Sequence, residues 1–149
     1  MPDSRPPRTD RGFSLIELLI VASIIAVISA IAIPYLVQSQ QAARYASAIS
    51  SLRTIHSSQM TYRTVKGVYT DLATLGDSGQ LSDTAIAAGE KSNYRFTVSL
   101  GADPTLSFTV DATPTITPTL WNHYFADQSG LIRFNAGAAA TIASPLINK

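Results

Sequence analysis

The sequence predicts an α+β protein in which one long N-terminal helix packs on a small antiparallel β-meander. An apolar run covers residues 13–37, and a helical stripe of apolar side chains continues to about residue 64. Alternating apolar and polar residues follow in the second half of the chain, as in half-buried strands. With 149 residues, the chain has room for one ordinary globular domain and little more.

The composition speaks against several functional classes. Only 14% of the residues are charged and the formal net charge is +1, which speaks against a disordered chain and against a nucleic-acid binder. The chain has no cysteine, so disulfides, thiolate zinc sites and cysteine nucleophiles are excluded. It has two histidines, which makes a histidine-rich metal site a poor expectation.

The apolar run at 13–37 is long enough to cross a membrane. It contains 25 residues with Glu17 as the single charge. As a helix it would be roughly 37 Å long, against a bilayer core of about 30 Å. The preceding segment carries Arg5, Arg8 and Arg11, which predicts a cytoplasmic N-terminus and a head on the other side.

Three interpretations of this N-terminus are open from the residues alone. A secretory signal peptide would be cut after Ala30-Ile31-Ala32, but its apolar run would normally be about 7–15 residues long. A plain membrane anchor is the second interpretation. In the third interpretation, Glu17 has a function. Its carboxylate is costly in an apolar environment, but it is tolerated because it later pairs with a cation.

The run Arg11-Gly12-Phe13-Ser14-Leu15-Ile16-Glu17-Leu18-Leu19-Ile20-Val21 favours the third interpretation. It resembles the class III signal sequence of type IV pilins and of type II secretion pseudopilins. The resemblance implies cleavage after Gly12 by a prepilin peptidase and N-methylation of Phe13. It also implies that Glu17 pairs with the N-terminal amine of a neighbouring subunit, an arrangement that rewards one stagger between copies.

Pro34 matches the proline that kinks the helix in this family. Relatives often have a glycine where this chain has Ala26. In a helix, alanine is more favourable than glycine by about 1 kcal/mol. Melting of the helix between Ala26 and Pro34 is therefore less assured in this chain than in those relatives.

Residues 38–66 continue the helix as an amphipathic segment. Its expected apolar stripe consists of Tyr45, Ile49, Leu52, Ile55 and Met60. Arg44 and Arg53 are expected on a solvated helix face, and contact with lipid headgroups or neighbouring subunits is the alternative. His56 has no partners at ligand spacing, so we expect a packing or surface role. Gly67 is the expected helix end.

The head, residues 67–149, begins with a Gly-, Asp- and Ser-rich loop that contains one short helical turn. Strands are predicted at 94–100, 106–110, 124–126 and 131–134, in a meander of three to four strands with one face on the long helix. The tail from Ala136 to Lys149 is weakly patterned, and it is either a short final strand or flexible.

The sequence contains no pattern that predicts an enzyme. We find no nucleophile elbow, P-loop, paired-carboxylate site or EF-hand, so we expect no catalytic residues, no cofactor and no metal. The last acidic residue is Asp127, whereas secretion major pseudopilins usually carry an acidic calcium loop near the C-terminus. The Thr/Pro stretch offers Thr113, Thr115, Thr117 and Thr119 as candidate O-glycosylation sites, and an ordinary rigid loop is the alternative.

The sequence therefore predicts a leader at 1–12, a membrane-spanning or filament-core helix at 13–37, an amphipathic helix at 38–66 and a head at 67–149. The expected function is that of a structural subunit of a type IV pilus-like filament. The resemblance implies as partners further copies of the chain, the prepilin peptidase and a pilus assembly platform, with no nucleic acid. It implies an inner-membrane precursor that becomes an extracellular pilus or a periplasmic pseudopilus. A minor pilin or pseudopilin is one alternative, and a soluble periplasmic domain behind an ordinary signal peptide is another.

Overall fold

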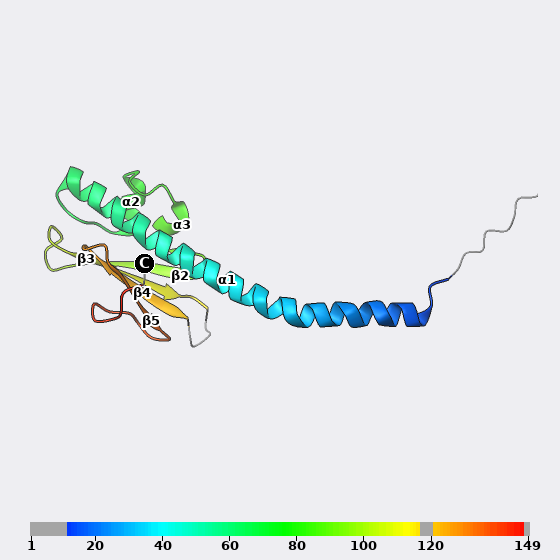
Figure 1. Ribbon diagram of the computed structural model, residues 1–149. Helices are drawn as coiled ribbons and strands as arrows, with labels where there is room; N and C mark the ends of the chain where they lie inside the picture. The colour runs from blue at the N-terminus through cyan, green and yellow to red at the C-terminus, as the bar shows by residue number, and fades with distance from the viewer. Residues whose placement is uncertain (1–11, 117–120, 148–149) are drawn as a thin grey trace, which may run out of the picture. The chain divides into compact units, whose positions relative to one another are not determined.

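The computed structural model describes residues 12–116 and 121–147, and it confirms the α+β fold. The described elements are α1 (Leu15–Lys66), α2 (Leu72–Asp77), α3 (Thr84–Ala87), β1 (Glu90–Lys91), β2 (Tyr94–Leu100), β3 (Phe108–Pro114), β4 (Asn122–Asp127) and β5 (Ile132–Ala136) (Figure 1). The chain divides into two compact units, residues 1–40 and 41–149, and each is described by itself.

The N-terminal unit consists of the first part of α1. Its residues are helical from Leu15 onward, and the helix is continuous through Pro34. By length and composition, α1 is apolar enough to cross a membrane.

The second unit is built on a five-stranded antiparallel sheet. The strand order is β1-β2-β3-β4-β5, so each strand pairs with its neighbours in the chain. Val98 lies opposite Val110, and Val110 lies opposite Ala126, which places their side chains on one face of the sheet. The meander expected from the alternating pattern is confirmed, with β1 as an additional two-residue strand.

The core of this unit lies between one face of the sheet and the second part of α1. Ala48, Leu52 and Ile55 of α1 belong to the same buried cluster as the inner side chains of the strands. Those side chains are Tyr94, Phe96, Phe108, Val110, Ala112, Tyr124, Ala126 and Ile132. A sheet this small is stable only with such an apolar face and a helix partner.

The segment between α1 and β1 forms two short helices, where the sequence predicts a loop with one helical turn. Asp71 caps the start of α2 by accepting from Thr74 N, and Asp83 caps α3 by accepting from Ala85 N and Ile86 N. Leu75 and Ile86 anchor these helices in the core. The physical reason for the difference is tertiary, because such short helices are stable only through their caps and the packing of their apolar side chains.

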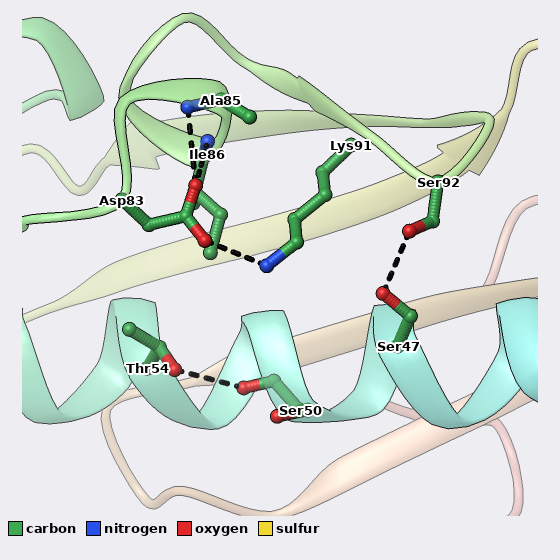
Figure 2. A network of polar contacts seen from close by, with 8 residues as sticks. All are labelled: Ser47, Ser50, Thr54, Asp83, Ala85, Ile86, Lys91 and Ser92. Carbon is green, nitrogen blue, oxygen red and sulfur yellow. Dashed lines mark hydrogen bonds and ion pairs between the residues drawn. The ribbon is translucent and has the colours of Figure 1, made fainter.

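Polar contacts tie the β1–β2 turn to its neighbours (Figure 2). Lys91 Nζ donates to Asp83 Oδ2 at 2.6 Å, and Ser92 Oγ lies 2.8 Å from Ser47 Oγ of α1. Ser92 and Asn93 both have positive φ, as expected at the two central positions of a type I′ hairpin turn. The hairpin is thereby held against α1 by one hydroxyl pair.

The amphipathic stripe of α1 differs from the expected one near its end. Met60 is 39% exposed, whereas Gln59 is fully buried. The Gln59 side chain donates to Thr70 O at 2.5 Å and accepts from Thr70 N at 3.1 Å. The buried stripe therefore ends in the polar side chain of Gln59. The segment after Gly67 packs against this part of α1, and the backbone N–H and C=O of Thr70 are the hydrogen-bond partners of Gln59.

Strand β3 begins and ends later than the predicted segment 106–110. It extends to Pro114, and Thr113 and Pro114 pair with Arg95 and Tyr94 of β2. Pairing of β3 with β4 stops at Ala112, so the strand is a sheet edge where the proline occurs. A proline is tolerated at such an edge because no neighbouring strand needs its N–H.

The described part of the tail is fastened to β5. Phe134 N donates to Pro145 O, Ile147 N donates to Ile132 O, and Arg133 forms a β-bridge with Leu146. The tail through residue 147 is thus an ordered extension of the sheet beside β5. Hydrogen bonds hold it in place, since the chain has no cysteine that could form a disulfide.

Candidate functional site at the start of the long helix

The residues expected to be processed lie just before the first turn of α1. Gly12 and Phe13 have no regular secondary structure, and the Phe13 side chain is 74% exposed. Leu15 is the first helical residue, so Ser14 occupies the N-cap position. The peptide bond between Gly12 and Phe13 is therefore outside the helix, and both residues are exposed.

The carboxylate of Glu17 folds back onto this helix start. Glu17 Oε2 accepts a hydrogen bond from Ser14 N at 2.8 Å. Ser14 and Glu17 have the Ser-x-x-Glu spacing of a capping box, in which the glutamate satisfies the N–H of the cap residue. Ser14 O also accepts from Glu17 N at 3.1 Å, which closes the first turn.

The hydrogen bond holds the Glu17 carboxylate at Ser14 N, one residue beyond the Phe13 nitrogen that cleavage would turn into an amine. Phe13 directly precedes Ser14, the donor of the observed hydrogen bond. A carboxylate at the N-terminal end of a helix is also stabilised by the helix dipole. The arrangement can therefore hold an anionic group ready for an ammonium at the same end of α1.

The first part of α1 has no polar face. From Phe13 to Val37, every large apolar side chain is between 48% and 80% exposed. An exposed apolar surface of this extent marks a membrane or protein contact. Glu17 is the charged side chain within it. Pro34 lies inside the helix, as expected, and the helix is unbroken between Ala26 and Pro34 in this structure.

Other residues singled out in the sequence take structural positions in the head. His56 packs near Phe108 with ring centroids 6.1 Å apart, and its Nε2 lies 3.2 Å from Gln128 O. Arg44 stacks over the Trp121 ring at 5.4 Å, whereas Arg53 is exposed. The contact between Arg44 and Trp121 joins residues distant in the sequence, and no local pattern could have indicated it.

The Thr/Pro stretch is only partly described. Thr113 and Thr115 are exposed, at the end of β3 and just after it, while Thr117 and Thr119 lie outside the described residues. Thr115 N donates to Asn93 O at 2.9 Å, so the backbone here is fixed. The exposed hydroxyls of Thr113 and Thr115 stay candidate O-glycosylation sites.

Asp111 and His123 are among the titratable groups of the head whose pKa is shifted by burial. Asp111 is on β3, opposite Phe125 in register, and burial raises the pKa of its carboxyl. Burial lowers the pKa of His123, whose Nδ1 has no hydrogen-bond partner among the described residues. Both shifts disfavour the charged form in the folded head.

We expect Asp111→Asn to stabilise the head at pH 7, because the folded state there must hold a desolvated carboxylate. Since the folded pKa lies above the unfolded one, near 4, this cost disappears once the pH falls below about 4. Urea unfolding of the full chain in detergent at pH 7 and pH 3 measures the difference. The exposed Asp77→Asn is the control, expected to change stability by less than about 0.5 kcal/mol. An equal gain at both pH values would contradict the burial argument.

Within residues 12–116 and 121–147, no three His, Cys, Asp or Glu side chains cluster closely enough to hold a metal ion.

Two comparisons with known proteins found similar sequences. Residues 7–33 match the model of the prokaryotic N-terminal methylation motif. The chain is similar to the type IV major pilin protein PilA of Myxococcus xanthus (strain DK1622), with 38% identity over 64 residues. That alignment covers 43% of this chain and 29% of the relative, so the chain matches less than a third of that protein's length.

Proposed function

We propose that this chain, whose N-terminal methylation motif and similarity to a major pilin support the type IV pilin family, is a structural subunit of a type IV pilus-like filament. The observation that carries the proposal is the start of α1. An accessible bond between Gly12 and Phe13, a carboxylate at Glu17 and an exposed apolar helix follow one another without interruption. Each is a requirement of processing followed by polymerisation.

The proposed sequence of events begins in the inner membrane. The apolar part of α1 spans the bilayer, and a prepilin peptidase removes the leader after Gly12. Methylation then modifies the new amine of Phe13. An assembly platform moves the helix from lipid into a bundle of identical helices, so its apolar side chains stay in an apolar environment throughout. Packing and polar pairing then control assembly more than burial from water does.

Pairing between Glu17 and the amine of another copy supplies the register in this proposal. In the isolated chain the carboxylate is satisfied by Ser14 N. An ammonium is a stronger partner than a neutral N–H, particularly in an apolar environment. A charge left unpaired there is costly, so staggers that leave Glu17 without an ammonium are disfavoured. The matched relative is a major pilin, which supports a main filament subunit ahead of a minor pilin or pseudopilin. The proposal assigns the chain no enzymatic activity.

Replacing Gly12 by leucine tests the processing step. A Cβ at Gly12 would meet no atom within 4 Å, so the substitution leaves the helix start intact. We expect the uncleaved precursor to accumulate in the membrane and surface filaments to be lost, as measured by the mass of the chain and by electron microscopy of the sheared cell-surface fraction. Ser23→Ala is the control, since Ser23 Oγ donates to Leu19 O of its own helix and to no other atom of the described residues. Normal filaments from the Gly12 variant would refute the proposed cleavage.

A further inference from the structure

Positive and negative charges are divided unequally between α1 and the residues that follow it. Beyond Glu17, the side chains of α1 that are charged at neutral pH are Arg44, Arg53, Arg63 and Lys66, and none is acidic. Apart from Asp3 and Asp10 of the predicted leader, all other acidic side chains follow α1 in the sequence. A chain that polymerises therefore presents a cationic helix and a more acidic remainder to its neighbours.

Most of these charges already have a partner within the chain. Arg44 stacks on Trp121, and Arg63 donates to Tyr69 Oη at 2.9 Å. Lys91 pairs with Asp83 and Arg95 pairs with Glu90. These contacts leave a small set of exposed charges for contacts with other molecules.

Three exposed side chains have no ion-pair or side-chain hydrogen-bond partner among the described residues: Arg53, Lys66 and Asp77. Lys66 lies in the last turn of α1, where a cation is stabilised by the helix dipole and the terminal carbonyls. Arg53 lies in the middle of α1, away from the helix ends, so the helix dipole and the terminal carbonyls do not stabilise its charge. Arg53 and Asp77 are therefore the pair whose charges are complementary and unused.

Asp77 also borders a hollow that suits a long cationic side chain. A cavity of about 480 Å³ lies beside α2 and α3. Apart from Asp77, its lining consists of small or apolar side chains: Ala73, Gly76, Gly79, Leu81, Ser82, Thr84 and Ala87. Arginine matches this lining because its aliphatic stem packs on apolar walls while its guanidinium binds a carboxylate.

The surface around Arg53 permits close approach. Ser50, Thr54 and Ser57 are exposed on the same part of α1, and all are small. Thr54 Oγ1 donates to Ser50 O, so this hydroxyl is satisfied by its own helix and needs no outside partner (Figure 2). Another protein surface can therefore cover the Thr54 hydroxyl without leaving it unsatisfied.

We propose that Arg53 of one copy inserts into the hollow beside α2 and α3 of a second copy and pairs with its Asp77. The inference rests on the proposed function as a homopolymer. The two partners belong to different patches of the same chain, so the contact is heterologous. Such contacts repeat into open helical filaments when the rotation does not close.

Charge reversal tests the pairing in filaments. We expect Arg53→Glu and Asp77→Lys each to lower the yield of sheared filaments about tenfold or more, because like charges then face each other across the contact. The double variant restores the opposite signs and is expected to recover most of the yield. Lys66→Glu makes the same change of charge on the same helix and is expected to leave the yield near that of the parent chain.

Cross-linking tests proximity independently of stability, since the chain has no cysteine of its own. Filaments of an Arg53→Cys, Asp77→Cys double variant, treated with a short bis-maleimide, are expected to give a ladder of covalent oligomers. The two single variants give no ladder. Normal filaments from both charge reversals, failure of the double reversal to recover, or a double-cysteine filament that yields only monomers would overturn the inference. Absence of filaments from the parent chain would instead refute the proposed function.

Discussion

Glu17→Ala is expected to abolish surface filaments while the head stays folded. The substitution removes the carboxylate that the proposal pairs with the Phe13 amine of another copy, so an ammonium is left unpaired in an apolar helix bundle. Removing one partner of a buried pair costs about 3–5 kcal/mol, which is enough to prevent assembly. Electron microscopy of the sheared fraction, together with immunoblotting of the membrane fraction, measures filaments and retained subunit separately.

Glu17→Gln is the matched variant, because it separates the charge from the hydrogen bond at the helix start. The glutamine oxygen can still accept from Ser14 N, as Glu17 Oε2 does at 2.8 Å, but it carries no charge. We expect this variant to lose filaments as the alanine variant does. Abundant filaments from Glu17→Gln alone would show that Glu17 acts as a capping residue, and filaments from both variants would rule out the pairing.

Gln59→Ala is expected to destabilise the head strongly. The fully buried Gln59 amide satisfies both backbone groups of Thr70, so truncation leaves a cavity and an orphaned N–H and C=O. Unsatisfied buried groups cost about 1–3 kcal/mol each, and a total loss of about 3 kcal/mol in the free energy of unfolding is expected. Urea unfolding of the full chain in detergent, monitored by fluorescence of Trp121, measures the loss.

Thr61→Ala is the control for Gln59, because Thr61 lies on the same helix and is exposed. Its hydroxyl donates to Ser57 O of its own helix, so we expect a change within about 0.5 kcal/mol. If the two substitutions had equal effects, the Gln59 contact would not be what joins α1 to the returning chain.

Much of the fold could be predicted because it depends on periodicity. The alternation of Tyr94 to Leu100 predicts a strand whose bounds the structure reproduces, and Gly67, with its positive φ, follows the end of α1 as expected. The sequence predicts one short helical turn where the structure has two helices, α2 and α3, because these depend on caps and on anchoring in a core that local sequence does not reveal. Gln59 was missed for the same reason, since its partner is the backbone of Thr70.

The candidate site consists of residues that are close in the sequence, unlike the contacts in the head. Gly12, Phe13 and Glu17 lie within a few residues of one another, so their relation is visible in the sequence itself. The hydrogen bond between Glu17 and Ser14 follows from the same short spacing, although the sequence drew attention to Glu17 only as a charge. The hollow that Asp77 borders is tertiary, because residues of α2, α3 and the chain between them form it together.

The most direct test of the central claim is the mass of the N-terminal peptide of protein sheared from the cell surface. Our account predicts a peptide that begins at N-methylated Phe13 in a filament fraction. A chain that begins at Ile33 would identify an ordinary secreted domain and contradict the account. Methylated Phe13 found in membranes alone would contradict a main filament subunit and indicate a minor pilin or pseudopilin.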